Sequence, residues 1–170
     1  MRRIQLVIAL LAGLTIAGCD SVVPGSPTGS QPSTSAPYHD LAVGELVQTW
    51  TQFDDDLNTA VLDYTSEHAP RILLRDQDEY DAWADDIPDE MAVAAEDITL
   101  ADQVAIVGYY TKCMEQSAVF HLGGGELRYD VWTAPEDEGT LCDASPLHVE
   151  LWVIDLEDLD VDAADVELIT

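Results

Sequence analysis

Basic side chains are scarce in this chain of 170 residues. Lys and Arg together number 6 against 34 Asp and Glu residues, and the formal net charge is −28. Such a chain repels phosphate backbones, so no nucleic-acid partner is expected. An anionic membrane surface would repel the folded part in the same way. A hydrophobic fraction of 47% is nevertheless enough to build a core, which argues against wholesale disorder.

The sequence also lacks an apolar run of the length that an ordinary membrane-spanning helix requires, about 20 residues. Its N-terminal apolar run covers residues 4–17, follows Arg2 and Arg3, and leads into Ile-Ala-Gly-Cys at residues 16–19. A positive start, a short apolar stretch, two small residues and a cysteine resemble the signal peptide of bacterial lipoproteins. A plain secretory signal with an incidental cysteine, or an uncleaved anchor, are the alternatives.

The resemblance implies that residues 1–18 are a lipoprotein signal peptide and that the thiol of Cys19 carries the lipid. Cleavage would remove Arg2 and Arg3, so 34 acidic residues would face 4 basic ones (6 minus 2), a balance of −30. Acyl chains, including palmitate, would then hold the chain at the cell membrane. The expected location is extracytoplasmic, in the periplasm or at the cell surface.

The segment that follows is poor in residues that could form a core. Ser, Thr, Pro and Gly make up 13 of the 21 residues from Asp20 to Asp40. This composition cannot bury enough apolar surface to offset the loss of backbone entropy. We therefore expect residues 19–40 to be a lipidated cysteine followed by a flexible tether, and residues 41–170 to form a single acidic domain.

The domain is predicted to be α+β, with a mainly antiparallel sheet and one well-marked helix. The helix begins after Asp76, where Glu79 completes a capping-box spacing. Tyr80 and Trp83 follow at helical spacing, and Pro88 ends the run. Apolar alternation predicts strands at residues 46–53, 72–74, 104–110, 117–122, 127–132 and 147–154, with residues 165–170 as a last edge strand or a frayed tail.

The strongest strand signal is a central hairpin. Three glycines, residues 123–125, separate two of the predicted strands and can supply the positive φ of a tight turn. Acidic residues are also sparse here, with only three among residues 103–135. Either this stretch is the buried centre of the sheet, or it presents a less charged docking surface.

Cysteine is rare: one of the three cysteines directly follows the predicted signal peptide and two lie in the predicted domain. With Cys19 lipidated, Cys113 and Cys142 remain as an even pair in an exported domain, which predicts a disulfide. A metal or redox pair is the weaker alternative, because neither cysteine belongs to a close Cys-Cys or Cys-His motif. No metal site and no cofactor are expected.

Motifs that carry catalytic chemistry are absent. The sequence has no Gly-x-Ser-x-Gly, no phosphate-binding glycine loop and no His-Glu-x-x-His. His121 and His148 fall on predicted strands and could approach each other, which leaves a hydrolase as a remote alternative. The carboxylates at residues 54–56 and 85–86 could bind divalent cations weakly, although solvated faces explain them better.

Residues 158–162 superficially resemble a calcium loop, but Ala163 replaces the required turn glycine. The acidity as a whole resembles that of proteins from salt-adapted organisms, and a high-GC genome could also produce it.

The order of the predicted elements from Arg71 to Ile154 resembles the C-terminal domain of the protease-complex accessory lipoproteins (PrcB-like, the dentilisin-complex subunit type). In that family a strand precedes a helix that carries a tryptophan, here residues 72–74 and Trp83. A strand that enters a glycine, a hairpin and a strand after a proline follow, here residues 104–108, 117–132 and 146–154. The likeness spans about half of the chain, and the cysteine pair and the acidity depart from it.

This resemblance implies an accessory or stabilising role beside an exported protein, without catalysis. The function expected from the sequence is therefore that of a non-enzymatic, lipid-anchored envelope protein whose acidic domain binds another exported protein. The alternative of a different class is a salt-adapted surface protein with weak divalent-cation binding.

Overall fold

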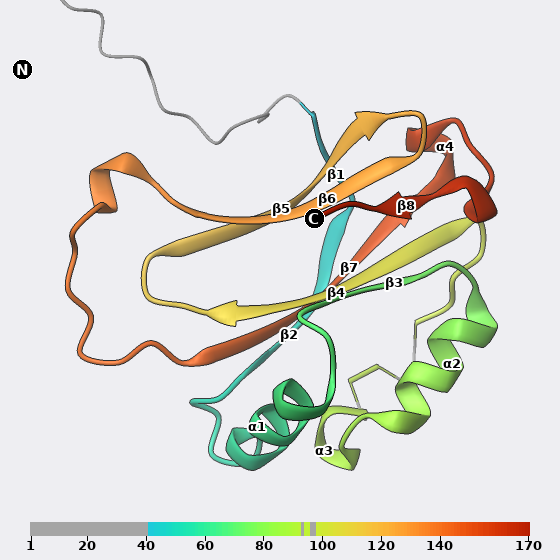
Figure 1. Cartoon of the computed structure of the whole chain (residues 1–170). Helices are drawn as coiled ribbons and strands as arrows, with labels where there is room; N and C mark the ends of the chain where they lie inside the picture. The colour runs from blue at the N-terminus through green and yellow to red at the C-terminus, as the bar shows by residue number, and fades with distance from the viewer. Residues whose placement is uncertain (1–40, 93, 96–97) are drawn as a thin grey trace, which may run out of the picture. The chain divides into compact units, whose positions relative to one another are not determined.

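A computed structural model describes residues 41–92, 94–95 and 98–170 of the chain. The predicted signal peptide, Cys19 and the predicted tether lie outside the described residues. Within them, no helix is both long enough and apolar enough to cross a membrane. The ribbon shows two sheets and a group of helices stacked in layers (Figure 1).

Four strands form a sheet whose outer face is covered by the helices. We call it the helix-backed sheet. Every strand pair in it is antiparallel. The central strands β7 and β4 pair over nine residues, from Gln103 opposite Asp155 to Thr111 opposite Leu147. In spatial order the strands are β2 (Glu45–Thr51), β7 (Leu147–Asp155), β4 (Gln103–Thr111) and β3 (Arg71–Leu74).

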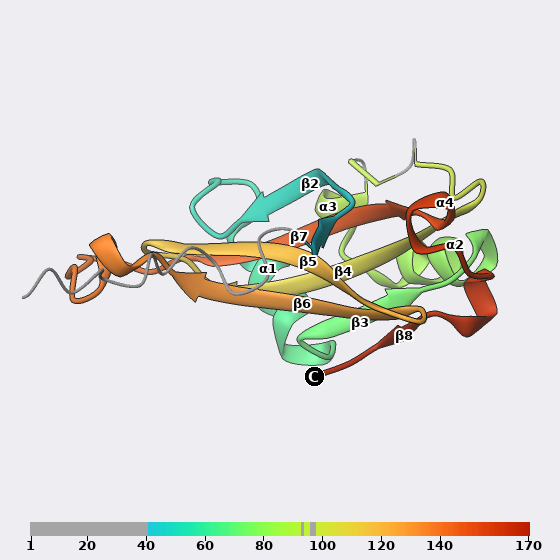
Figure 2. The ribbon, with the colours of Figure 1, turned by 90° about the horizontal axis from the view of Figure 1, so that it is seen from above.

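A second sheet, the hairpin sheet, lies on the other face of the first. Seen from above, its long β5–β6 hairpin runs over β7 and β4 (Figure 2). Its two edge strands are only two residues long, and β8 pairs with β6 in parallel. In spatial order the strands are β1 (Ala42–Val43), β5 (Glu115–Gly123), β6 (Glu126–Thr133) and β8 (Glu167–Leu168). The α+β class and the mainly antiparallel pairing are thus confirmed.

The predicted helix is α2 (Gln77–Asp86), and its cap is as expected. The side chain of Asp76 accepts a hydrogen bond from the backbone N–H of Glu79 at 2.9 Å. The helix α1 (Asn58–Glu67) was not predicted, because it begins without a side-chain cap and buries only three residues. The remaining helical segments are short: α3 (Asp89–Ala92), α4 (Leu156–Leu159), η2 (Pro135–Asp137) and η3 (Ala163–Asp165).

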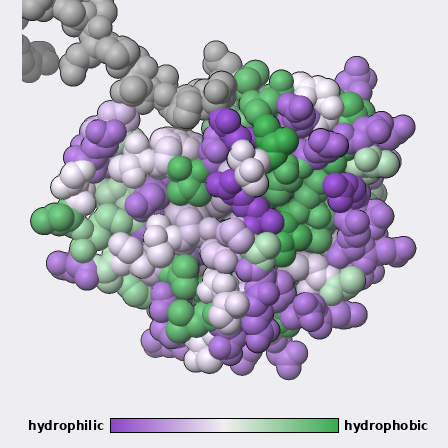
Figure 3. All heavy atoms as spheres, in the orientation of Figure 1, coloured by the Kyte–Doolittle hydropathy of each residue, from purple (hydrophilic) through white to green (hydrophobic). Residues whose placement is uncertain are grey.

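The helix-backed sheet is covered on both faces and separates two apolar clusters. The cluster on the helix side includes Trp50, Tyr64, Trp83, Met91 and Leu151. The cluster between the two sheets includes Ile106, Val119, Leu127 and Ile154. Hydrophilic residues dominate the margin over the helices, whereas a band of hydrophobic atoms crosses the sheets near β8 (Figure 3).

The central hairpin has the predicted turn. Gly123, Gly124 and Gly125 have φ values of +105°, +63° and +85°. At Gly125 space is restricted as well, because a Cβ atom would lie 2.5 Å from the carbonyl oxygen of Asp165. The inner face of the hairpin, including Val119, is buried between the sheets.

The predicted disulfide is also present. Cys113 and Cys142 are bonded, with their Cα atoms 5.9 Å apart. The bond ties the connection between β4 and β5 to the loop that precedes β7. A second link lies beside it, because the backbone N–H of Lys112 donates to the carbonyl oxygen of Pro146 at 2.8 Å. One end of the two-sheet sandwich is therefore held covalently.

Candidate functional site

The alternation of β7 sends one carboxylate into the space between the sheets. Val149 and Leu151 face the helices, so Glu150 faces the hairpin sheet. Its exposed fraction is 2%, and it is the one charged side chain that is buried in the described part of the chain. A buried charge is costly unless hydrogen bonds satisfy it, so the surroundings of Glu150 decide what it can do.

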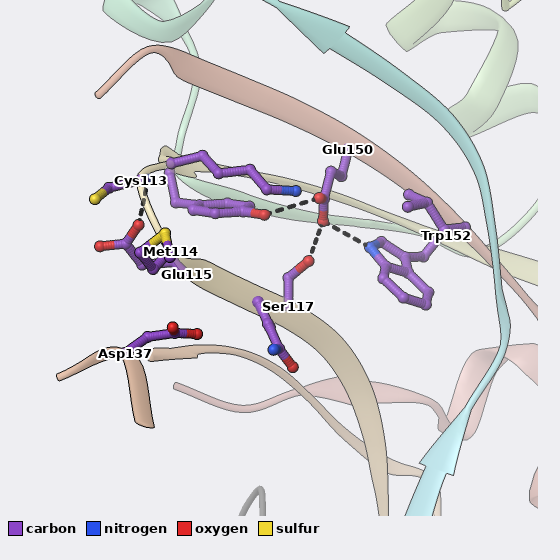
Figure 4. Close-up of a pocket in the computed structure, with 11 residues that line it drawn as sticks. Cys113, Met114, Glu115, Ser117, Asp137, Glu150 and Trp152 are labelled. Carbon is purple, nitrogen blue, oxygen red and sulfur yellow. Dashed lines mark hydrogen bonds between the residues drawn. The ribbon is translucent and has the colours of Figure 1, made fainter. Parts of the chain in front are cut away.

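Four donors surround the Glu150 carboxylate. The Tyr110 hydroxyl donates to Oε1 at 3.0 Å. Three donors reach Oε2: Ser117 Oγ at 2.5 Å, the Tyr129 hydroxyl at 3.1 Å and Trp152 Nε1 at 3.2 Å. Figure 4 shows Ser117 and Trp152 directed at the carboxylate of Glu150. An ionised carboxylate only accepts, so four neutral donors suit it without a neighbouring cation.

Each donor comes from a different strand, and the approach of Tyr129 requires a glycine. In the β4–β7 ladder, Gly108 lies opposite Glu150. A Cβ atom on Gly108 would lie 2.5 Å from ring atoms of Tyr129. The absence of a side chain at residue 108 therefore lets the ring of Tyr129 lie against β4, beside the carboxylate.

Burial and the carboxylate together hold the tyrosines in their neutral form. Loss of solvent, and then the charge of Glu150, raises the pKa of Tyr129 well above its ordinary value of 10.0. Burial raises the pKa of Tyr110 to about 12, although a hydrogen bond with Ser117 partly opposes this shift. Both hydroxyls consequently remain donors throughout the physiological pH range.

An open pocket of about 400 Å³ lies beside this cluster. Figure 4 shows Glu150 and Trp152 on one side of it, with Glu115 and Asp137 on the other. The backbone N–H of Cys113 donates to the carboxylate of Glu115 at 2.5 Å. This bond, with further backbone donors, lowers the pKa of Glu115. The remaining lining residues are Leu46, Tyr110, Lys112, Cys113, Met114, Gln116 and Ser117.

His148 adjoins the cluster on β7. Its Nε2 lies 3.2 Å from Thr51 Oγ1, and its ring centroid lies 6.1 Å from that of Tyr110. Its Nδ1 is buried without a hydrogen-bond partner. Burial, followed by the positive charge of Lys112, lowers the pKa of His148, while Glu150 opposes the shift. The imidazole is thus kept neutral.

The structure brings together the two cysteines singled out in the sequence but not the two histidines. Ser117 contacts Glu150, and His121 lies four residues further along β5 toward the glycine turn. His148 lies in the other direction along β7, at the end where β7 begins, so the two histidines lie toward opposite ends of the sandwich. No group of three or more His, Cys, Asp or Glu side chains in the described ranges is arranged to hold a metal ion.

Two exposed apolar side chains flank the disulfide. Met114, next to Cys113, is 36% exposed, and Leu141, next to Cys142, is 96% exposed. Hydrophobic atoms protrude at the end of the molecule formed by the β6–β7 loop, at the left of Figure 3. Sequence reasoning missed the whole site around Glu150. A charged residue on the inward face of an alternating strand was the available signal.

Comparisons with known proteins identify no relative of this chain. No protein-family model, no curated protein and no solved structure matches the chain. The resemblance to accessory lipoproteins therefore stays a prediction from the sequence. Any function has to be argued from the site itself.

Proposed function

We propose that this protein is a lipid-anchored, extracytoplasmic binding module without catalytic activity, attached to the membrane through Cys19. Its domain binds another exported protein at the end of the sandwich that carries the disulfide. The observation that carries the proposal is the pair of exposed apolar side chains, Met114 and Leu141, held beside the disulfide and next to the pocket.

At this end of the molecule, exposed apolar side chains lie among acidic ones, because the loop that carries Leu141 also carries Glu136, Asp137 and Glu138. A leucine that is 96% exposed gains nothing from the fold, so its side chain is available to a partner. The disulfide restrains the loop that carries it, which reduces the entropy lost on binding. Exposed apolar side chains with a polar rim are typical of protein interaction sites.

The disulfide also supports the location. Disulfides persist in oxidising compartments and are rare in the cytosol of most organisms. A bond between Cys113 and Cys142 thus agrees with an exported domain. Attachment through acyl chains would place an acidic domain at a membrane that its own surface avoids.

Labelling tests the anchor. Cells that express the chain are given a palmitate analogue that can be tagged, and the protein is then isolated from the membrane fraction. We expect label on the wild-type chain and none on a Cys19→Ala variant. A wild-type chain that carries no label, or that fractionates as a free soluble protein, would contradict the anchor.

Cross-linking followed by purification in detergent tests the binding function. We expect one stoichiometric partner with the wild-type chain, and its loss in the variant with Met114→Ser and Leu141→Ser. Leu62→Ser is the matched control, because Leu62 is 41% exposed on α1, an element that contains neither disulfide cysteine. Recovery of the lone chain under all conditions, or equal losses in both variants, would contradict the proposal.

A further inference from the structure

An unpaired stretch of strand edge lies at the pocket. β1 pairs with β5 only through Ala42 opposite Phe120 and Val43 opposite Val119. At Gly44, where φ is +80°, the chain leaves the hairpin sheet and continues as β2 in the helix-backed sheet. On that side of β5, residues 115–118 consequently pair with no strand of the described chain.

Gly44 fixes this departure. A Cβ atom at residue 44 would lie 2.7 Å from Ile154 Cγ1 and 2.9 Å from the carbonyl oxygen of Val153. Only a glycine fits where the chain passes this close to β7. The free edge of β5 therefore follows from the path that the chain takes at Gly44. Its unpaired N–H and C=O groups can bind an extended chain.

The free edge and the pocket form one surface. Glu115, Gln116 and Ser117 belong to the unpaired stretch and also line the pocket. In a strand added along this edge, every second side chain would point toward the pocket. The surface thus offers backbone hydrogen bonds to an added strand and a pocket for one of that strand's side chains.

The charge of the pocket favours a basic side chain. Its lining contains the carboxylates of Glu115, Asp137 and Glu150 against the single ammonium group of Lys112. Lys112 belongs neither to the His68–Asp86 pair nor to the Arg128–Asp130 pair. Oε1 of Glu150 accepts one hydrogen bond, from Tyr110, and a carboxylate oxygen has about two lone-pair positions.

The remaining walls suit the rest of such a side chain. Trp152 and Tyr110 line the pocket, and aromatic rings attract ammonium and guanidinium groups. Leu46 and Met114 are 41% and 36% exposed, respectively, and can contact the aliphatic stem of a lysine or arginine.

We propose that the unpaired edge of β5 binds an extended, basic segment of the exported partner by strand addition, with a lysine or arginine side chain in the pocket. This inference rests on the proposed binding function and names the chemistry of the partner. The occupant recognised here is a β-strand with basic residues at alternate positions.

Peptide binding to the purified full chain in detergent tests the inference. The probe is a short labelled peptide of alternating valine and arginine, followed by fluorescence anisotropy at about 0.15 M salt. We expect saturable binding with one peptide per chain. A peptide with prolines in place of the valines keeps the charge but loses every second backbone N–H, and its proline rings oppose pairing within a sheet, so we expect no binding. Equal binding of both peptides would overturn strand addition.

Paired variants test the pocket. In a variant with Glu115→Gln and Asp137→Asn, we expect affinity to fall roughly tenfold, the size of losing two partly exposed ion pairs. A variant with Glu126→Gln and Glu167→Gln removes the same charge from exposed residues at the glycine-turn end of the hairpin. It should bind almost as tightly as the wild type. Equal loss of affinity in both variants would mean that the peptide is attracted by the overall charge of the domain, and this would overturn binding in the pocket.

The two proposals can fail separately. If a stoichiometric partner co-purifies with the wild type and equally with the variant of Glu115 and Asp137, this inference is wrong and the binding function stands. If no partner co-purifies at all, the binding function is wrong whatever the peptide does.

Discussion

The ring of Tyr129 occupies the space that a side chain on Gly108 would need. Ring atoms Cε1 and Cζ of Tyr129 lie 2.5 Å from the position of a Cβ atom on Gly108. The two residues belong to different sheets, so this contact sets how closely the sheets approach at this point. It also brings the Tyr129 hydroxyl to within 3.1 Å of Glu150, which lies opposite Gly108 in the β4–β7 ladder.

A methyl group at residue 108 should therefore displace the ring. We expect Gly108→Ala to lower the free energy of unfolding by about 1–3 kcal/mol, the usual cost of overpacking a core. Denaturant unfolding measures this value. In a Tyr129→Leu background the same substitution should cost much less, because the obstructing ring is gone. Equal costs in both backgrounds would mean that the contact does not limit the packing.

Replacing the acceptor of the cluster should destabilise the domain without changing its shape. Glu150→Gln replaces one carboxylate oxygen by an N–H₂ group, which donates and does not accept. The donors at that position then lose their acceptor: Tyr110 at Oε1, or Ser117, Tyr129 and Trp152 at Oε2. We expect a loss of roughly 2–4 kcal/mol in the free energy of unfolding. Glu157→Gln, at an exposed residue, is the control and should be nearly neutral. A neutral Glu150→Gln would show that the hydrogen bonds contribute little.

Removing the disulfide should cost stability through the unfolded state. The bond closes a loop with a sequence separation of 29 residues, for which chain entropy gives about 3–4 kcal/mol. A variant with Cys113→Ser and Cys142→Ser should unfold at correspondingly lower denaturant concentration. Titration of the non-reduced wild-type domain should find neither thiol reactive, and two reactive thiols would contradict the bond.

Acidification should weaken the domain through His148. Because burial, reinforced by Lys112, lowers the folded-state pKa below the ordinary value of 6.5, the unfolded chain binds a proton more readily than the folded chain. Stability is therefore present above pH 6.5 and is lost as pH falls from there toward the folded-state pKa. Chemical unfolding at a series of pH values from about 7.5 to about 5.5 measures this loss.

A His148→Gln variant should lose less stability over this range than the wild type. His121→Gln controls for the removal of a histidine as such. If the free energy of unfolding of His148→Gln falls with pH as steeply as that of the wild type, other groups cause the pH dependence.

Features that depend on neighbouring residues were predictable from the sequence. The alternation in residues 147–154 predicted β7, because side chains of a strand point alternately to either side. The cap at Asp76 and the turn at residues 123–125 were found for the same reason, since each depends on a few adjacent residues. The disulfide followed from the parity of the cysteines.

The helix α1 was not predictable in this way. It begins at Asn58 after Leu57, whose side chain makes no capping hydrogen bond. Only Ala60, Val61 and Tyr64 of the helix are buried, so its apolar stripe is weak in the sequence. Packing against the helix-backed sheet, rather than local preference, accounts for it.

The sequence by itself determined the α+β composition, the hairpin and the acidic, cysteine-paired character of the domain, because these follow from short-range periodicity and from counts of residues. Only the tertiary structure decided that Tyr110, Ser117, Tyr129 and Trp152 would meet at Glu150. These donors belong to β4, β5, β6 and β7, and the stacking of two sheets, allowed by Gly108, brings them to one carboxylate. The departure of the chain at Gly44 likewise leaves an open strand edge beside that cluster, which no local pattern reveals.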